Sequence, residues 1–486
     1  MASTNHDSLR SEFERVVAPE RVLTHPHALR TYESDGLLQY RETPAIVVLP
    51  DTAEEVQAVV AACYQARVPW VARGSGTGLS GGAVPVKEGV LIVLTRLRKI
   101  LEVDLENQRV VAEPGVTNLQ VSAAAAPTHF FPPDPSSQII CSVGGNVAEN
   151  SGGAHCFKYG FTTNYVLGMD VVLSDGEMVT LGGAELDHPG YDLVGPFVGS
   201  EGTLGIATKI VLRVVPLPET FRTLVAFFEG MEQAGQAVSD IVAAGIVPGA
   251  IEIMDRLAIR ATDEATGAGY RLDVGAALIA ELDGSAPDCE LAFNQVSEIC
   301  EAAGSVEIRI ARDEAERQLI WKARKAAFAS MGRLAPNYFV QDGVIPRTRL
   351  PRVLAAIEEL AHRYNVRVAN VFHAGDGNLH PLVLYDHAVP GEAGRAEEVS
   401  RLIVEACVEL GGSLTGEHGI GLDKKKYMPK MFSPADLDAF QRLRCAFDPA
   451  QLANPGKVMP TPRLCGEVPG EYRRHPLERD GIAERF

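Results

Sequence analysis

The chain has 486 residues, of which 46% are apolar and 22% are charged, as is typical of an ordinary globular protein with two or three domains. Its formal net charge of −18 argues against nucleic acid or an anionic membrane as the main partner. The N-terminal residues do not show the basic stretch followed by an apolar core that is typical of a signal peptide, and no apolar run approaches the ~18 residues of a membrane span. We therefore expect a cytoplasmic protein. The eight cysteines form no CxxC pair, so neither a disulfide framework nor a zinc or iron–sulfur site is indicated.

The first 220 residues alternate strands and glycine-rich segments. A strand at 45–49, a helix that starts at a Thr52-x-x-Glu55 capping box and a strand at 68–72 predict a βαβ unit. Further strands are expected at 90–94, 100–103 and 109–112, a short helix at 116–126, a hairpin of 166–173 with 177–181, and a strand that ends at Val215. Pro216 and Pro218 then mark a domain boundary.

The glycine-rich segment at 72–83, ARGSGTGLSGGA, is the strongest single feature. Glycines let the main chain approach a ligand, and bare N–H groups beside Arg73 suit a phosphate. Gly76, Gly78 and Gly81 match GxGxxG, but a Rossmann fingerprint must lead into a helix, and here a strand follows. We therefore expect a backbone nest for a nucleotide cofactor; the alternative is a flexible surface loop.

Two more glycine clusters follow, SVGGNVAENSGG at 142–153 and GSEGTLG at 199–205. In the first, Asn146, Glu149 and Asn150 suggest a surface fitted against a planar or polar ligand. The alternative is a tight helix–strand packing site that uses Gly144 and Gly145. Three clusters flanked by strands favour one large, extended ligand.

Beyond the boundary the pattern becomes βαββαβ, the ferredoxin-like order, with strands at 222–228, 249–254, 275–282 and 305–311 and helices at 230–244 and 286–303. A helix from 313 to about 332 follows, with Trp321, Arg324 and Phe328 on one face. An arginine on an apolar stripe needs an anion, because burying it unpaired is costly. That anion is either a structural carboxylate or the carboxylate of a substrate.

A second chemical centre lies near the C-terminal end. Strands at 366–373 and 379–385 flank Asp376-Gly377; if these two residues form the turn, His373 directly faces His380, and the two imidazoles can share a divalent metal. Glu417 and His418 lie in the segment GGSLTGEHGIGL, and we assign Glu417 to the metal and His418 to the role of a base. A His₂Glu set suits zinc, manganese or iron acting as a Lewis acid. The alternative is that these side chains are satisfied by hydrogen bonds alone.

In their order, these segments resemble the flavin-linked oxidases of the vanillyl-alcohol oxidase type, and among them most closely the catalytic FAD subunits of glycolate oxidases and the related D-lactate and D-2-hydroxyglutarate dehydrogenases. The motifs that carry the resemblance span about 45 to 457: ARGSGTGLSGGA, PPDPSS, SVGGNVAENSGG, KYGFTTNYVLG, GSEGTLGI, WKARKAAF, HAGDGNLH, GEHGIG and FDPAQLANPGK. The resemblance implies an α+β protein: a two-subdomain FAD-binding fold with a ferredoxin-like cap. The expected division is 1–218 for FAD binding, 219–430 for the cap with the metal site, and 431–486 for a segment that returns to the FAD domain.

The resemblance also implies roles for individual residues. Noncovalent FAD would be bound by Arg73, Gly74, Ser75, Gly76, Thr77, Gly78, Leu79, Ser80, Gly81, Gly82, Pro133, Ser142, Gly144, Gly145, Asn150, Gly153, Gly160, Glu201, Gly202, Ile206 and Asn454. Arg324 would clamp the substrate carboxylate, His373, His380 and Glu417 would bind the metal, and His418 would be the catalytic base. D-2-hydroxyglutarate dehydrogenases carry Thr and Lys where this chain has Phe328 and Val340, which argues for a small monocarboxylate.

The resulting hypothesis is an FAD-dependent dehydrogenase of a small 2-hydroxy acid, glycolate first and D-lactate or a broader range of D-2-hydroxy acids second. His418 would take the hydroxyl proton while hydride passes from Cα to flavin N5. A flavin-binding subunit without chemistry is the alternative from another class. Electrons would pass to an iron–sulfur partner subunit, a quinone or a soluble carrier, and a homodimer, a hetero-complex and membrane contact through a partner all stay open. The tail from Leu464, with Arg473, Arg474 and Arg485, is either a partner contact or a solvated end.

Overall fold

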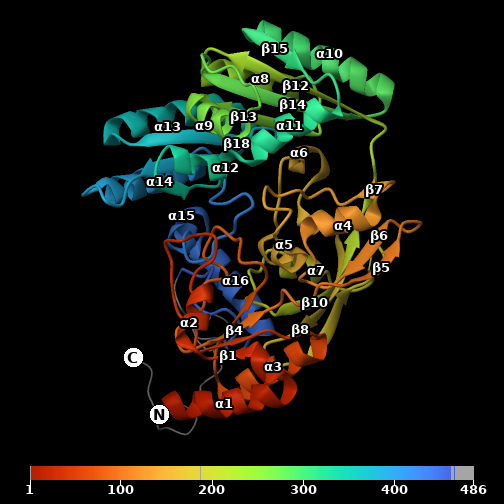
Figure 1. The fold of residues 1–486 in the computed structure, drawn as a ribbon, viewed down its shortest axis with the longest axis vertical. Coiled ribbons are helices and arrows are strands. Elements are labelled where there is room, and N and C mark those ends of the chain that lie inside the picture. The colour runs from red at the N-terminus through yellow and green to blue at the C-terminus, as the bar shows by residue number, and fades with distance from the viewer. Residues whose placement is uncertain (1, 187, 461–464, 466–486) are drawn as a thin grey trace.

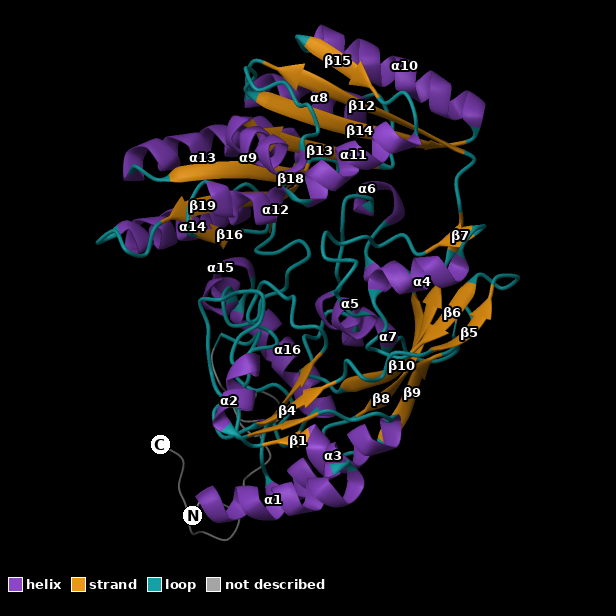
Figure 2. Cartoon of the chain, in the orientation of Figure 1, coloured by secondary structure: helices purple, strands orange, loops and turns teal. Residues whose placement is uncertain are grey.

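The computed structural model describes residues 2–186, 188–460 and 465, and it divides into two halves, drawn one above the other in Figure 1. The lower half holds a four-stranded sheet, a five-stranded sheet, the short pair of β7 (His129–Phe130) with β11 (Val215–Pro216), and the N-terminal helices. The upper half is one large sheet covered by helices (Figures 1 and 2). This mixture of helices and mainly antiparallel sheets confirms the α+β class. Apart from Cys465, the tail from Leu464 falls outside the described residues.

The first sheet of the lower half has the order β1-β2-β4-β3, with bounds Val22–Leu23, Ile46–Val48, Val90–Val93 and Trp70–Arg73. Strands β2 and β3 both pair with β4 in parallel, as the βαβ prediction requires. Helix α3 (Ala53–Ala66) connects them, and its N-cap Thr52 accepts a hydrogen bond from the Glu55 N–H. Helix α3 and helix α1 (Ala2–Val16) pack on this sheet around the fully buried Trp70.

The second sheet is antiparallel, in the order β5-β6-β10-β8-β9, with bounds Ile100–Asp104, Arg109–Ala112, Ile206–Arg213, Val166–Val172 and Met178–Gly182. Helices α4 (Asn118–Ala125) and α5 (Val143–Glu149) lie beside it (Figure 1). The second glycine cluster therefore forms a short helix, because Ser142 caps it by accepting from the Gly145 N–H. The sequence analysis did not predict this helix, and its interpretation of the cluster as a surface fitted against a ligand stays a prediction.

The upper half contains the predicted βαββαβ unit, with strands β12 (Thr220–Phe228), β13 (Ala250–Asp255), β14 (Ala276–Gly284) and β15 (Glu307–Ile310) in the order β15-β12-β14-β13. Strands β18 (Arg367–His373), β19 (Asn378–Tyr385) and β16 (Asn337–Val340) extend it beyond β13, and β17 (Gly343–Val344) pairs with β19. The histidine hairpin is thus part of the cap sheet.

Helices cover both faces of the cap sheet. One face packs against α8 (Met231–Ala243), α10 (Ala286–Ala302), α13 (Leu350–Tyr364) and α14 (Glu392–Glu409). The other packs against α9 (Arg256–Thr266), α11 (Glu314–Lys325) and α12 (Ala327–Ser330). The prediction missed α9, and the single helix expected from 313 to about 332 is divided at Ala326 into α11 and α12.

The C-terminal segment contacts the lower half. Helices α15 (Met428–Met431) and α16 (Pro434–Phe447) precede Asn454, whose backbone N–H donates to the Trp70 carbonyl and whose side chain donates to Gly82. The division into three segments itself stays a prediction. Cys445 and Cys465 form a disulfide, which the cysteine spacing did not indicate. Within residues 2–186, 188–460 and 465, no helix combines the length and the apolar character needed to cross a bilayer.

Candidate functional site: a glycine-lined cavity beside a histidine cluster

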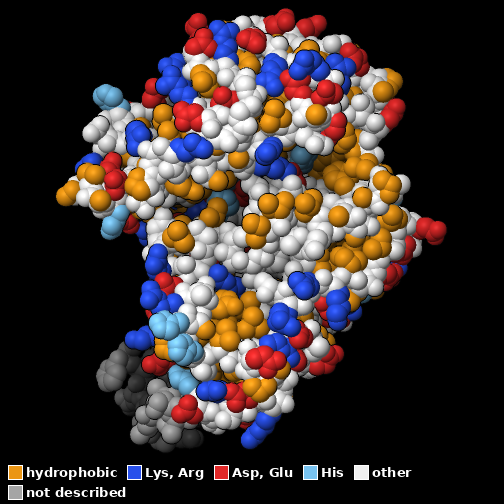
Figure 3. Space-filling view, in the orientation of Figure 1, with side chains coloured by type: hydrophobic (Ala, Val, Ile, Leu, Met, Phe, Trp, Pro, Cys, Tyr) orange, Lys and Arg blue, Asp and Glu red, His pale blue; other side chains and the backbone are white. Residues whose placement is uncertain are grey.

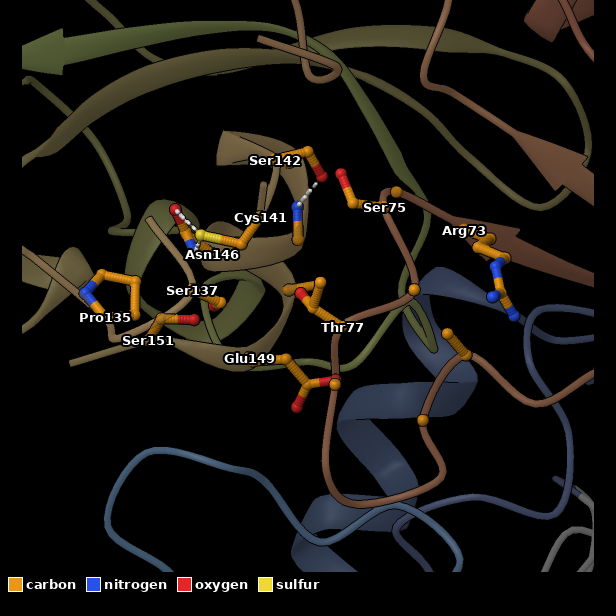
Figure 4. A pocket seen from close by; sticks show the side chains of 18 of the residues that line it. Arg73, Ser75, Thr77, Pro135, Ser137, Cys141, Ser142, Asn146, Glu149 and Ser151 are labelled. Carbon is orange, nitrogen blue, oxygen red and sulfur yellow. Dashed lines mark hydrogen bonds between the residues drawn. The ribbon is translucent and has the colours of Figure 1, made fainter. Parts of the chain in front are cut away.

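A cavity of about 350 Å³ lies where the glycine-rich segments of the lower half meet the cap. The space-filling view shows the surface hollowed between the two halves (Figure 3). In the close-up, Ser75 and Thr77 of the first glycine segment lie across from Ser142, the N-cap of α5, and Glu149, its last residue (Figure 4). Residues of α11 and α12 and the Glu417-His418 segment also line the cavity. One cavity therefore joins the two chemical centres that the sequence indicated.

Most of the predicted FAD residues line this cavity: Arg73, Gly74, Ser75, Gly76, Thr77, Gly78, Leu79, Gly82, Ser142, Gly144, Gly145, Glu201, Gly202 and Ile206. The others do not line it: Ser80, Gly81, Pro133, Asn150, Gly153, Gly160 and Asn454. Asn454 nonetheless joins two of the glycine segments, because its amide donates to the carbonyls of Gly82 and Glu201. Contact of any of these residues with FAD stays a prediction.

The first glycine segment bends sharply around its cation. Gly76 and Gly81 have φ of +70° and +80°, which glycine adopts at no steric cost. Arg73 curls back toward Gly76, donates to the Ser34 carbonyl at 2.7 Å and lies apart from the other labelled side chains (Figure 4). The segment connects β3 to β4 without an intervening helix, so the Rossmann interpretation is excluded, as predicted.

Helix α5 forms the opposite wall, and its backbone lies close to its neighbours. A Cβ on Gly144 would lie 2.5 Å from the Pro114 Cβ and 3.0 Å from the Pro114 carbonyl oxygen. Any larger residue would push the start of α5 into the cavity or away from it. The same glycine thus packs closely against its neighbour and also lines the cavity, so the two alternatives that the sequence left open do not exclude each other.

Three carboxylates gather between the glycine segments: Asp35, Glu149 and Glu201. Burial raises the pKa of Asp35 to about 6 and that of Glu201 to about 7, although Glu201 accepts from the N–H groups of Ile420 and Gly421. Burial and the neighbouring Glu201 raise the pKa of Glu149 well above its usual range. Oε2 of Glu149 has no hydrogen-bond partner among the described residues, which leaves a polar group for a ligand in the cavity.

The two histidines of the hairpin meet, but not in the predicted register. The structure pairs His373 with Asn378 and His380 with Val371, so the connection spans residues 374–377 rather than a two-residue turn, and the prediction of directly opposed histidines was wrong. The shift is by two positions, which keeps both side chains on the same face of the sheet. Their rings therefore still lie 5.0 Å apart, now as diagonal neighbours.

Glu417 completes this cluster. Its Oε1 lies 3.3 Å from His373 Nε2 and 3.2 Å from His380 Nε2, and ligand atoms of all three residues lie within 4.8 Å of one another. His380 Nε2 and Glu417 Oε2 have no hydrogen-bond partner among the described residues. Two imidazoles and a carboxylate with uncommitted atoms fit a zinc, manganese or iron ion, so the predicted metal ligands are placed together. Hydrogen bonds from within the protein do not satisfy them all, which disfavours the alternative interpretation.

The tautomers of the two imidazoles are also those that metal binding by His373, His380 and Glu417 would require. His373 Nδ1 lies 2.7 Å from Glu252 Oε1, and His380 Nδ1 lies 3.3 Å from the Gln341 carbonyl oxygen. Each partner accepts a hydrogen bond, so each Nδ1 carries the proton and each Nε2 is left as the atom that faces Glu417.

Asp342 anchors the segment that carries Glu417 and His418. Its fully buried carboxylate accepts from the backbone N–H groups of Gly416, Glu417 and His418 and lies 3.0 Å from Lys424 Nζ. Burial lowers the pKa of His418 to about 4, so its imidazole is neutral and can accept a proton. Its ring stacks on His380 with centroids 4.9 Å apart, and His418 lines the cavity together with Glu417.

Arg324 is committed within the protein. Its side chain is 2% exposed, and Nη2 lies 2.5 Å from Glu252 Oε2, so the structural-carboxylate alternative is realised. Arg324 does not line the cavity, but its Nε has no hydrogen-bond partner among the described residues. Binding of a substrate carboxylate by Arg324 stays a prediction.

Sequence reasoning missed several residues of the cavity wall: Pro114, Pro135, Ser136, Ser137, Cys141, Ala148, Ser151, Phe197, Ser200, Lys325 and Ala329. Residues 135–137 belong to the PPDPSS motif and Lys325 belongs to WKARKAAF, so these motifs held the signal. Ser200 belongs to the third glycine cluster, and for Phe197 we find no local sequence signal.

Comparisons with known proteins show the family and the fold of the chain. The family described as "FAD binding domain" matches residues 44–182, and "FAD linked oxidases, C-terminal domain" matches residues 217–458. The chain is 49% identical over 445 residues to "Glycolate oxidase subunit GlcD" of Escherichia coli, covering 91% of this chain and 89% of the relative. It is 37% identical over 452 residues to the protein of the same name in Bacillus subtilis (93% and 96% covered) and 33% identical over 453 residues to "D-lactate dehydrogenase" of Anaerostipes hadrus (91% and 95%).

Solved structures share the fold at low sequence identity. p-Cresol methylhydroxylase with substrate bound superposes with a TM-score of 0.77 at 17% identity, covering 94% of this chain and 97% of that chain. The 4-ethylphenol oxidase of Gulosibacter chungangensis gives 0.77 at 19% identity (95% and 98% covered). These likenesses confirm the predicted two-subdomain FAD-binding fold. Taken with the sequence relatives, they show that the chain is an FAD-dependent oxidoreductase that belongs to the family of FAD-linked oxidases.

Proposed function

We propose that the protein oxidises glycolate to glyoxylate, with D-lactate as the second candidate substrate. The observation that carries the proposal is that His418 and Glu417 line the same cavity as the glycine segments, so a base lies in the space that also receives the cofactor. Glycolate oxidase subunits at 49% and 37% identity support glycolate, and a D-lactate dehydrogenase at 33% supports the second candidate. The complete set of four site residues disfavours a flavin-binding subunit without chemistry.

In this proposal each side chain has one task. His373, His380 and Glu417 hold a divalent metal, neutral His418 removes the hydroxyl proton, and Arg324 offers its uncommitted Nε–H to the carboxylate. When bound, FAD accepts the hydride from Cα, and the metal lowers the pKa of the hydroxyl group. The reaction balances because the substrate loses one hydride from the alcohol carbon and one proton from its hydroxyl oxygen. Asp342 and Glu252 keep the base and one metal ligand in place.

The wall beside the metal ligands favours a small substrate. The Phe328 ring packs edge-on against His380 with centroids 5.5 Å apart, and Val340 is buried at the end of β16. Neither side chain can bind a second carboxylate. This supports a monocarboxylate of two or three carbons over a dicarboxylate.

The names of the relatives support only a general proposal about the electron-accepting partner and the location of the protein. Because glycolate oxidase relatives are named as subunits, we propose that electrons leave through a partner: an iron–sulfur subunit, a quinone or a soluble carrier. A cytoplasmic location, with membrane contact through that partner, is part of the same proposal. Whether the chain also forms a homodimer stays open.

The proposal is tested by anaerobic flavin reduction with glycolate, D-lactate and D-2-hydroxyglutarate side by side. We expect reduction by glycolate, slower or comparable reduction by D-lactate, and little by the dicarboxylate. Chelation should abolish reduction, and readdition of Zn²⁺, Mn²⁺ or Fe²⁺ should restore it. A flavoprotein that none of the three acids reduces would refute the function, and full activity in a metal-free preparation would refute the metal.

A further inference from the structure

The end of helix α11 presents two neighbouring cations to different environments. Lys325, the last residue of α11, lines the cavity together with Phe328 and Ala329 of α12. Arg324, one residue earlier and about 100° around the helix, is buried and paired with Glu252. Of these two cations, Lys325 is the one on the cavity wall.

This wall belongs to the histidine end of the cavity. Phe328, which lines the cavity together with Lys325, contacts the His380 ring, and His380 stacks on His418. Two of the described lining residues carry a full positive charge, Arg73 and Lys325. Arg73 belongs to the first glycine segment and donates to the Ser34 carbonyl, so the positive charge near the proposed chemistry is that of Lys325.

An ion pair holds Lys325 in position and leaves part of its hydrogen-bonding capacity available. Its Nζ lies 3.0 Å from Asp134 Oδ2, across the boundary between the two halves. Asp134 is shared, because His155 approaches it through Nδ1 at 3.0 Å and through its backbone N–H at 3.1 Å. An ammonium group has three donors, and the Lys325 side chain keeps 26% of its surface exposed. At least one donor is therefore left for a ligand in the cavity.

A carboxylate that enters this cavity meets mainly acidic side chains. Glu149, Glu201 and Glu417 all line it, and burial of an anion beside them is costly unless a cation pairs with it. We propose that Lys325 binds the carboxylate of the 2-hydroxy acid and thereby orients the alcohol carbon toward His418, while Asp134 fixes the lysine to the wall. This assignment rests on the proposed function and adds a second cation to the one proposed for Arg324.

The test measures anion binding without turnover. Methoxyacetate, a methyl ether of glycolate that offers no hydroxyl proton, is titrated into the FAD-loaded enzyme, and its Kd is read from the flavin absorbance. We expect Lys325→Met to weaken methoxyacetate about 10- to 100-fold, the size of a lost charge-assisted hydrogen bond. Lys325→Arg should recover most of the affinity. Lys322→Met, a change at an exposed lysine of the same helix, should leave it unchanged.

Two further measurements distinguish carboxylate binding from other roles of Lys325. The flavin reduction potential and the thermal midpoint of Lys325→Met should stay near those of the wild type. An unchanged methoxyacetate Kd in Lys325→Met overturns the assignment. If the flavin reduction potential shifts instead, the lysine interacts with the flavin. If the thermal midpoint falls instead, the lysine only stabilises the contact between the two halves. If the wild type oxidises glycolate and Lys325→Met keeps its affinity, this inference alone fails. If the wild type neither binds methoxyacetate nor oxidises glycolate, the proposed function fails with it.

Discussion

Glu252 and His373 are directly opposed on strands β13 and β18, and Glu252 Oε1 lies 2.7 Å from His373 Nδ1. The other carboxylate oxygen of Glu252 pairs with Arg324, so one buried carboxylate connects the arginine of α11 to a metal ligand of the hairpin. A carboxylate behind a ligating histidine fixes its tautomer and increases its basicity. Arg324 therefore influences the proposed metal site even where it does not touch it.

From this relationship we predict that Glu252→Gln weakens metal binding by about 10- to 100-fold. The glutamine keeps the shape of the side chain but removes the charge that holds the Nδ1 proton and balances Arg324. Metal content after dialysis, together with calorimetric titration of Zn²⁺ or Mn²⁺, measures the effect. Glu298→Gln, a change at an exposed position of α10, is the matched control. Equal metal affinity in Glu252→Gln and wild type would contradict the role of Glu252.

For His418 we predict a loss of chemistry without a loss of cofactor. His418→Ala should keep the yellow flavin spectrum, while the rate of anaerobic flavin reduction by glycolate falls about 10²- to 10⁴-fold, the usual contribution of a general base. Stopped-flow absorbance gives this rate. His362→Ala, at an exposed histidine of α13, should reduce at the wild-type rate. Normal reduction in His418→Ala would remove the assignment of the base.

The sequence predicted which residues form the histidine cluster better than it predicted how they are arranged. Asp376-Gly377 suggested a two-residue turn, but the connection takes four residues, and the histidines still meet because an even shift preserves the face of a strand. The Arg324 pattern predicted a buried cation with an anionic partner, yet the partner is Glu252, 72 positions earlier in sequence. Such a contact is set by how β13 packs against α11, and no local pattern encodes it. Helix α5 was missed because two glycines disfavour a helix that Ser142 and tertiary packing stabilise.

At the cavity wall we predict that Gly144→Ala releases FAD. The added Cβ would lie 2.5 Å from the Pro114 Cβ and 3.0 Å from a backbone oxygen, so α5 must move, at a cost of about 1–3 kcal/mol. FAD content after gel filtration and the thermal midpoint with and without added FAD measure the change. Gly332→Ala adds a methyl group with no atom within 4 Å and should match the wild type. Full FAD retention in Gly144→Ala would show that α5 does not form the cofactor wall.

The boundary between the two halves should make stability depend on pH through His155. Burial by itself would lower the pKa of this imidazole, but Asp134 and Glu281 on either side raise it to about 10. An unfolded histidine titrates near 6.5, so the folded state holds a proton that the unfolded state releases between pH 6.5 and about 10. The stabilisation is therefore complete below pH 6.5 and declines as the pH rises toward 10, by up to about 1.4 kcal/mol per pH unit.

We accordingly predict that His155→Gln lowers the free energy of unfolding most at pH 6.5, and that the difference from wild type shrinks steadily up to pH 10. Other buried groups titrate in this range in both proteins, so the difference between them isolates His155. Urea unfolding at several pH values from 6.5 to 10 gives the curve, with His387→Gln, at an exposed position, as the matched control. A difference that stays constant or grows with pH would mean that His155 is neutral in the folded protein, and that Asp134 is then balanced by Lys325 alone.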